Sequence, residues 1–251
     1  MLIYVIAPGS AIWHPGRERN DYNSDRPRKS GGANFRRGTG VATARGARAL
    51  INNGKGTTMS HMHHHHHHGA TRTAAEDLRE EHVIIERALS VLEAFAVGVE
   101  AGKAVPKERV ESLLDLLKTF ADKCHHGKEE QILFPALLAT NAADARATVD
   151  ELLKEHEVGR AAVRRMSDGI AGWDKPEARR LFAAAAHDYV DLLRRHIAKE
   201  TEGLLPLSER LLSQPEQLAL AGRFQAMEEQ VIGHGVHDRL LRTLEDLERA
   251  V

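Results

Sequence analysis

The chain has 251 residues, of which 28% are charged, and a formal net charge of −1 at pH 7. This length is enough for one or two domains with a real hydrophobic core. No stretch comes near the roughly 20 uninterrupted apolar residues of a membrane span, so we predict no transmembrane helix and no membrane partner. A single cysteine, Cys124, excludes an intrachain disulfide and indicates a reducing cytoplasm.

The first 58 residues differ from the rest in charge and composition. They hold ten Lys or Arg and three acidic residues, a net charge of +7, which leaves −8 for residues 59–251. An acidic folded part argues against nucleic acid as its main partner. Residues 1–58 also contain nine glycines and no sustained hydrophobic period, so they lack the apolar surface needed to fold. We therefore interpret them as disordered.

Two interpretations of this basic segment compete. An Arg-rich arm could bind nucleic acid. We favour a non-native leader, with translation beginning at Met59, because the segment Gly54–Gly56 can be encoded by a purine-rich run that resembles a ribosome-binding site. The following HMHHHHHH, residues 61–68, resembles an affinity tag, with a natural metal-collecting tail as the rival interpretation. We place residues 1–70 outside the folded domain.

From Thr73 the apolar residues recur with the period of an α-helix, and Thr73-Ala-Ala-Glu76 has the form of a capping box. No β-rich segment follows, so we predict an all-α fold, a four-helix up-down bundle over residues 71–213. Its helices are expected at Thr73 to Gly102, Pro106 past Leu133, about 144–169 and about 176–212, with Pro135 and Pro206 causing a kink or a local end. A fifth helix at about 215–251, broken by Gly-His-Gly, would form a C-terminal extension over residues 214–251.

The helical part contains an internal repeat. HHGKEEQILFP (His125–Pro135) aligns without a gap with HIAKETEGLLP (His196–Pro206), which matches Glu129 with Glu200. Earlier in each copy, EEHVIIERA around His82 matches KEHEVGRAA around His156. The chain is therefore a duplicated α-hairpin, and each copy contributes the pattern H…HxxxE.

This pattern predicts a metal site. Residues four apart project from one face of an α-helix, so each HxxxE brings an imidazole and a carboxylate to one point. Imidazole and carboxylate suit iron, and bridging Glu side chains can span two ions in a bundle core. Without metal, burying these groups together would carry a severe desolvation cost. The candidate ligands are His82, His125, Glu129, His156, His196 and Glu200.

Several neighbouring residues are weaker candidates. His126 points about 100° from His125 on an α-helix, so we expect it to be a supporting or surface residue, and we expect loss of Glu130 to be nearly silent. His187 is expected at the surface. Cys124 has no counterpart in the second copy, which favours a packing role. Glu86 lies four residues after a candidate ligand, but its counterpart in the second copy is an arginine.

These motifs resemble the hemerythrin-like, or HHE cation-binding, family: EEHVIIERALSVLE, HHGKEEQILFPAL, LLKEH and HIAKETEGLLP. The resemblance covers about residues 75–212. It implies a four-helix bundle with a non-haem di-iron centre and bridging carboxylates, and it places the six candidates at the family's ligand positions.

The chain also departs from part of that family. Oxygen-carrying hemerythrins have a second His where this chain has Arg160, and they end on a His and an Asp five apart where it has His196 and Glu200. A site poorer in His argues against reversible oxygen carriage. The set is more similar to that of di-iron proteins that repair iron–sulfur clusters, and to bacterial hemerythrin-like proteins linked to peroxide or nitric oxide. In the segment IGHGVHDRL, His237, or less favourably His234, could add a ligand; an ordinary surface histidine is the equal alternative.

We expect a di-iron protein that binds or reduces a small oxidant (oxygen, peroxide or nitric oxide) in a stress response. Six protein ligands cannot fill two six-coordinate irons, so open positions should remain. The alternative is a non-catalytic iron store, sensor or donor, including iron–sulfur cluster repair. A helical interaction protein that docks through its fifth helix is a third interpretation. Whether the protein is an enzyme is left open.

We predict that a chain beginning at Met59 folds and binds metal as the full chain does, because residues 1–58 cannot contribute to a core. The check compares the thermal midpoint and the metal content of the two proteins. A clear drop in thermal midpoint on deletion would show that the segment is structural.

Overall fold

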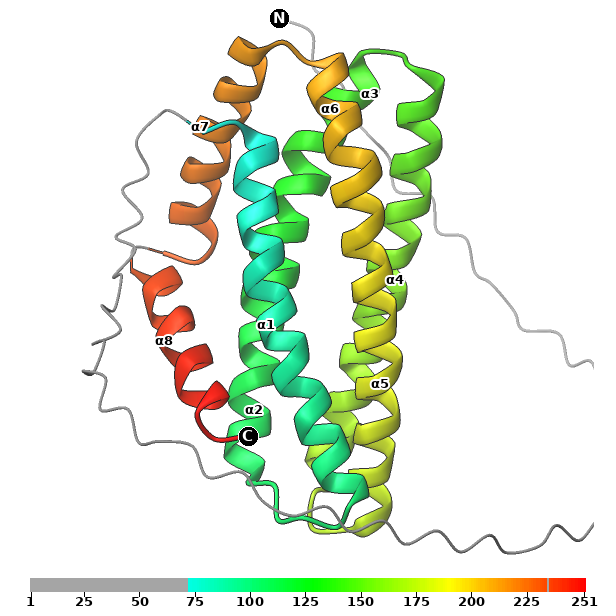
Figure 1. Ribbon diagram of the computed structural model, residues 1–251, viewed down its shortest axis with the longest axis vertical. Helices are drawn as coiled ribbons and strands as arrows, with labels where there is room; N and C mark the ends of the chain where they lie inside the picture. Colours follow the sequence, from blue (N-terminus) through cyan, green and yellow to red (C-terminus); the bar gives the residue numbers. More distant parts are fainter. Residues whose placement is uncertain (1–71, 234) are drawn as a thin grey trace, which may run out of the picture. The chain divides into compact units, whose positions relative to one another are not determined.

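The computed structural model describes residues 72–233 and 235–251 (Figure 1). The expectations for residues 1–70, and the weaker candidate His234, lie outside this part of the chain. Within the described residues there is no strand, which confirms the all-α prediction. None of the helices in these residues is long and apolar enough to cross a membrane.

Four long helical segments run up and down as an antiparallel bundle, as predicted (Figure 1). Each of the second and fourth segments combines α-helix with π-helix, the latter labelled η. The segments are α1 (Ala74–Glu100); α2 (Lys107–Leu116), η1 (Leu117–His126), η2 (Glu129–Leu133) and α3 (Phe134–Ala139); α4 (Ala143–Ala171); and α5 (Pro176–Lys199), η3 (Glu200–Leu204) and α6 (Leu205–Leu211).

The ends of α1 follow the local signals in the sequence. Thr73 Oγ1 accepts a hydrogen bond from the Glu76 amide at 3.3 Å, and Glu76 Oε2 accepts one from the Thr73 amide at 2.8 Å. This capping box supplies partners for amides that the first helical turn leaves unpaired. Beyond the last turn, Gly102 has φ +70°, a left-handed conformation that glycine adopts without strain.

Both internal prolines are accommodated by a change in helix type. Pro135 and Pro206 each occupy the second residue of a short α-helix that directly follows a five-residue π-helical turn, η2 or η3. In an α-helix, proline lacks an amide donor and clashes with the carbonyl four residues earlier. The wider π turn relieves that conflict. The expected kink or local end is therefore a π turn, present at the same place in both copies of the repeat.

The buried apolar side chains form two clusters, one toward each end of the bundle. Leu78 on α1 belongs to one cluster and Ile85 belongs to the other, with buried His82 between them. In each of the other three segments, residues of one cluster likewise precede a buried histidine or glutamate, and residues of the other cluster follow it. A layer of buried histidines and glutamates therefore divides the core.

The C-terminal extension consists of two helices, α7 (Gln214–Val231) and α8 (Val236–Glu248), where the sequence predicted one broken helix. Gly233 and Gly235 have φ of +85° and +70°, so the turn between the helices uses conformations that favour glycine. α7 contacts α1, η1 and η2, and α8 contacts α1 and α2. The domain boundary at residue 213 stays a prediction.

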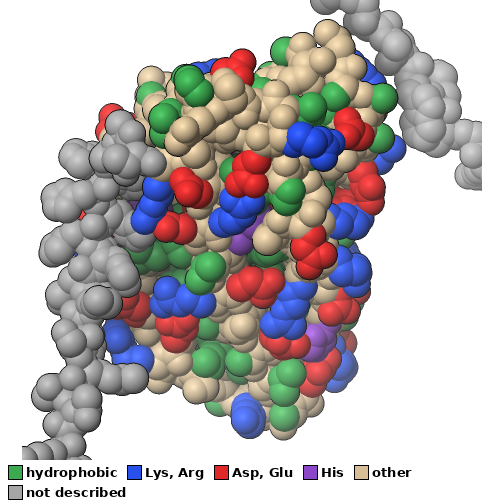
Figure 2. Space-filling model, turned by 45° about the horizontal axis from the view of Figure 1, so that its top comes forward, with side chains coloured by type: hydrophobic (Ala, Val, Ile, Leu, Met, Phe, Trp, Pro, Cys, Tyr) green, Lys and Arg blue, Asp and Glu red, His purple; other side chains and the backbone are tan. Residues whose placement is uncertain are grey.

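Charged side chains of both signs are spread over the surface shown in Figure 2. In the face drawn in Figure 2, Lys and Arg alternate with Asp and Glu and form no large patch of one sign. This distribution is typical of amphipathic helices that turn their polar faces to water.

Gly169 allows α4 and α5 to pack closely, because a Cβ added there would lie 2.9 Å from the Ala178 carbonyl oxygen and 2.9 Å from the Phe182 amide. We predict that Gly169→Ala destabilises the fold by about 1–3 kcal/mol, since backbone atoms must shift. The matched control is Gly222→Ala in the interior of α7, where nothing lies within 4 Å of the added Cβ. It should be neutral or stabilise by up to about 1 kcal/mol. Urea unfolding measures both changes.

Candidate metal centre

The polar layer brings together all six candidate ligands from the sequence. Their exposed fractions lie between 0% and 4%, so they are shielded from bulk water. Each helical segment contributes. The residues are His82 on α1, His125 on η1, Glu129 on η2, His156 on α4, His196 on α5 and Glu200 on η3.

The four histidines form two similar pairs. The ring centroids of His82 and His125 are 4.9 Å apart with the planes at 66°, and those of His156 and His196 are 4.8 Å apart at 65°. Each pair comes from one α-hairpin, so the duplication read in the sequence is present in the geometry.

The two glutamates lie between the pairs. Glu200 Oε2 is 3.1 Å from His82 Nε2, and its Oε1 is 3.0 Å from His196 Nε2. Glu129 Oε1 is 3.8 Å from His125 Nε2, and its Oε2 is 3.4 Å from His156 Nε2. Each carboxylate therefore turns one oxygen toward each histidine pair, as a carboxylate bridging two ions would.

The outer nitrogen of each histidine is held by a hydrogen bond. The Nδ1 atoms of His125 and His196 donate to Glu81 and Glu155, each at 2.9 Å. A carboxylate acceptor keeps a proton on Nδ1, so Nε2 is the nitrogen that would give its lone pair to a metal ion at the centre of the bundle. Metal-binding histidines in proteins are oriented in this way. The other two contacts are His156 Nδ1 to Glu130 at 2.6 Å and His82 Nδ1 to Thr201 Oγ1 at 3.0 Å.

Several atoms at the centre of the layer lack hydrogen-bond partners there and are suited to binding metal ions. Both oxygens of Glu129, Oε1 of Glu200 and Nε2 of His125 are buried and lack a hydrogen-bond partner among the described residues. Leaving such atoms unpaired is costly, and cations would offset that cost. Within the layer, two groups of ligand atoms each lie within 4.8 Å of one another: His82, His125, Glu129 and Glu200; and His126, Glu129, His156 and His196. A third group, outside the layer, consists of Glu81, Cys124 and Glu228.

The presence of His126 in the second group corrects the sequence interpretation. The side chain is 3% exposed, and its ring stacks on that of His156 at 3.9 Å. The rotation of about 100° per residue assumed an α-helix. His126 instead ends the π-helix η1, whose wider turns rotate successive residues by a smaller angle. Consequently His125 and His126 both face inward, which period-3.6 reasoning could not detect.

Glu130 and Arg160 also have roles that the sequence did not reveal. Glu130 Oε1 accepts hydrogen bonds from His156 Nδ1 and from Arg160 at 2.8 Å. Arg160 also donates to Asp122 at 2.8 Å, and Asp122 Oδ1 lies 3.5 Å from His126 Nδ1. Where oxygen carriers would have a ligand, this chain therefore has a guanidinium that fixes the carboxylates behind two of the histidines.

His237 is not brought to the metal centre, which corrects its place among the candidate ligands. Its Nδ1 bonds Glu228 Oε1 at 3.1 Å, and its ring packs edge-on against Phe120 at 5.4 Å. The reason is that α8 packs on the outer side of α1 and α2. His237 belongs to none of these groups of converging ligand atoms.

The remaining weaker candidates are where the sequence placed them. The side chain of His187 is 36% exposed and pairs with Glu100, and Glu86 faces Arg194. Cys124 is buried, and burial together with the nearby charge of Glu81 raises the pKa of its thiol. The raised pKa makes this thiol a weak nucleophile.

The electrostatics of the layer favour bound cations. Burial alone lowers the pKa of His125 and His196, but the charges of Glu129 and Glu200 outweigh it and raise the two pKa values to about 10 and about 9. Burial holds the pKa of His126 well below its usual value. In the metal-free protein the protonated rings of His125 and His196 therefore balance the carboxylate charge, and metal ions would displace the protons on these rings.

A four-helix bundle with inward-facing histidines and shared carboxylates defines the class of proteins that bind metal ions in the bundle core. Within that class, the chain belongs to the hemerythrin HHE cation-binding domain family, whose model matches residues 73–208. This confirms the resemblance noted in the sequence.

Relatives of similar size occur in mycobacteria. The chain is similar to the uncharacterized protein Rv1995 of Mycobacterium tuberculosis and the uncharacterized protein Mb2018 of Mycobacterium bovis. Each is 24% identical over 182 residues, which cover 71% of this chain and 70% of the relative. No solved structure matches.

We predict different losses for the two adjacent glutamates of η2. Glu129→Ala should lose most of the bound metal, because its oxygens face both histidine pairs. Glu130→Ala should weaken metal binding about 10–100-fold, because it frees the His156 ring while leaving the inner ligands in place. Anaerobic titration with ferrous iron measures both affinities.

The matched control is Glu157→Ala. Glu157 also pairs with Arg160, at 2.7 Å, but its side chain is 66% exposed and does not touch a histidine of the layer. It should bind metal like the wild type. An affinity of the Glu130→Ala protein equal to that of this control would contradict the role assigned to Glu130.

Proposed function

We propose that this protein binds two non-haem iron ions and uses them to bind or reduce a small oxidant (oxygen, peroxide or nitric oxide) in a cytoplasmic stress response. The observation that carries the proposal is the position of Glu129 and Glu200. Each carboxylate turns one oxygen to each pair of histidine Nε2 atoms. Shared carboxylates in a bundle core are typical of paired iron or manganese.

The ligand chemistry supports iron within that choice. Imidazole nitrogen with carboxylate oxygen is the set used by non-haem iron proteins, whereas magnesium and calcium prefer oxygen alone. The one cysteine, Cys124, belongs to neither of the two groups of inner ligand atoms. We propose His82, His125, His156 and His196 with the two glutamates as ligands, and we add His126 as a further candidate beside His156.

The burial of the site supports a small ligand. With side chains between 0% and 4% exposed, the layer has no room for a large substrate in contact with the metal. Six or seven protein ligands leave open positions on two six-coordinate ions. The bound iron would supply the redox chemistry. The chain would hold the imidazole rings in place through Glu81, Glu130 and Glu155, and would exclude bulk water.

We predict that protein from which residues 61–68 have been removed retains about two irons per chain after expression with ample iron. Removing the histidine run ensures that the metal counted belongs to the bundle. Metal analysis gives the stoichiometry, and optical spectra before and after each gas or peroxide give the reactivity. Recovery of one closed zinc site per chain would refute the paired site.

The same spectra separate oxidant chemistry from iron storage. Rapid consumption of peroxide or nitric oxide by the iron-loaded protein, and none by the metal-free protein, is the expected result. Two bound irons that react with none of the three oxidants would instead favour an iron store, sensor or donor.

A further inference from the structure

A charged arm lies behind His125. The His125 Nδ1 atom donates to Glu81 Oε2 at 2.9 Å, and Lys128 Nζ donates to Glu81 Oε1 at 2.5 Å. Glu81 and Lys128 are 5% and 4% exposed. The buried ammonium of Lys128 is thus linked to His125, a proposed iron ligand, through two successive hydrogen bonds.

The second copy of the repeat has the same arm in a different setting. His196 Nδ1 donates to Glu155 Oε2 at 2.9 Å, and Lys199 Nζ donates to Glu155 Oε1 at 2.5 Å. Lys199 also pairs with Glu151. Here the lysine side chain is 43% exposed and Glu155 is 18% exposed, so water screens the charges. Both copies of the repeat therefore contain the His–Glu–Lys arm, but only in the first copy is the arm buried.

Helices α7 and α8 account for the difference. At Gly127, next to Lys128, an added Cβ would lie only 2.4 Å from the Met227 methyl group of α7, so the missing side chain lets α7 approach. The Phe224 ring of α7 lies 5.9 Å from Lys128 Nζ. These contacts cover the first arm with the C-terminal extension.

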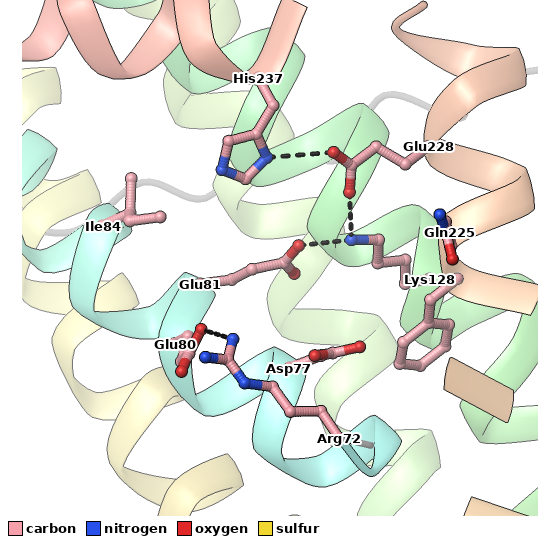
Figure 3. Close-up of a pocket in the computed structure, with 10 residues that line it drawn as sticks. Arg72, Asp77, Glu80, Glu81, Ile84, Lys128, Gln225, Glu228 and His237 are labelled. Atoms are coloured by element: carbon pink, nitrogen blue, oxygen red, sulfur yellow. Dashed lines mark hydrogen bonds and ion pairs between the residues drawn. The ribbon is translucent and has the colours of Figure 1, made fainter. Parts of the chain in front are cut away.

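The extension also continues the arm (Figure 3). Lys128 Nζ donates to Glu228 Oε2 on α7 at 2.8 Å, and Glu228 Oε1 bonds His237 Nδ1 on α8 at 3.1 Å. Four consecutive contacts thus link α8 to the metal layer. They run His237–Glu228–Lys128–Glu81–His125, and the first four of these residues line a small surface pocket.

The three central members of this chain are charged. Burial raises the pKa of Glu81 and Glu228, but the charge of Lys128 and the bonds from His125 and His237 outweigh it and lower both pKa values to about 2. The same carboxylates raise the pKa of Lys128 against the effect of burial. One buried cation is therefore shared between two buried anions, one from the bundle and one from the extension.

We propose that Glu228 is a positioning residue of the metal centre, and that α7 and α8 serve to make its two ions inequivalent. Glu228 draws part of the Lys128 charge away from Glu81, which leaves Glu81 a stronger acceptor for His125 and makes His125 a better ligand. An ion held by His82 and His125 would be tuned by this buried arm. An ion held by His156 and His196 would be tuned by the screened arm. The inference rests on the proposed pair of irons.

The test replaces Glu228 by glutamine in the full iron-loaded chain, a change that removes the charge and keeps the shape. The matched control is Glu151→Gln, the same change beside the lysine of the exposed arm. For Glu228→Gln we expect a higher reduction potential and ferrous iron affinity lowered about 10–100-fold at one of the two sites. Mössbauer spectra should show one of two iron environments altered. Glu151→Gln should give a distinctly smaller shift.

A second control separates tuning from loss of structure. Arg87 holds α8 through two hydrogen bonds to Glu248, both 2.8 Å and remote from the arm. Glu248→Gln should weaken the docking of α8 and lower the thermal midpoint of the metal-free protein, without moving the potential. Glu228→Asp keeps the negative charge that Glu228→Gln removes, so its reduction potential should lie much closer to that of the wild type.

The outcomes are distinguishable. A wild-type protein without two irons overturns the proposed function itself. Two irons in the wild type, with equal potentials for Glu228→Gln and Glu151→Gln, overturn the role of Glu228 alone. A potential that follows the thermal midpoint through Glu248→Gln overturns it as well, because the effect would then be structural.

Discussion

The burial of Glu129 and Glu200 at the centre of the bundle is the constraint on which the other features depend. Both side chains are 0% exposed, and most of their oxygens lack hydrogen-bond donors among the described residues. Charges in such a setting persist only if cations or protons neutralise them. Four histidines supply that contact, their outer nitrogens require acceptors, and two of those acceptors require lysines. Successive hydrogen-bond partners therefore extend outward from the two carboxylates, and the last of them contact either water or the C-terminal helices.

Much of this arrangement could be predicted from the sequence, because the repeat encodes it twice. Matching Glu129 with Glu200 selected the more deeply buried of the two adjacent glutamates, and the capping box and glycines marked the helix ends. Even the outer partners had a visible signal: Glu81 and Glu155 each directly precede a matched histidine. Reading that signal required knowing that a residue beside one ligand on its helix reaches the ligand of the neighbouring helix, which is a tertiary fact.

The errors came from assuming uniform α-helix. His126 was placed away from the axis because the second segment was given 3.6 residues per turn, whereas η1 and η2 are π-helical. His237 was kept as a candidate ligand, with a surface histidine as the equal alternative, because nothing in its local sequence reveals the side of the bundle on which α8 packs. Pro135 and Pro206 follow η2 and η3, but no proline marks the end of η1, the π-helix that carries His126.

The polar layer has a consequence for how the protein opens. It divides the apolar core into two clusters, which are built on the same helices but are separated by the layer of charged side chains. In the metal-free protein that seam is held by protons and hydrogen bonds, whereas bound ions would clamp both histidine pairs at once. Proteins open in contiguous cooperative units of differing stability. Metal occupancy would therefore decide whether the two ends of the bundle exchange their amide hydrogens as a single unit or independently. Iron loading would then change the amide exchange rates along the whole length of the helices.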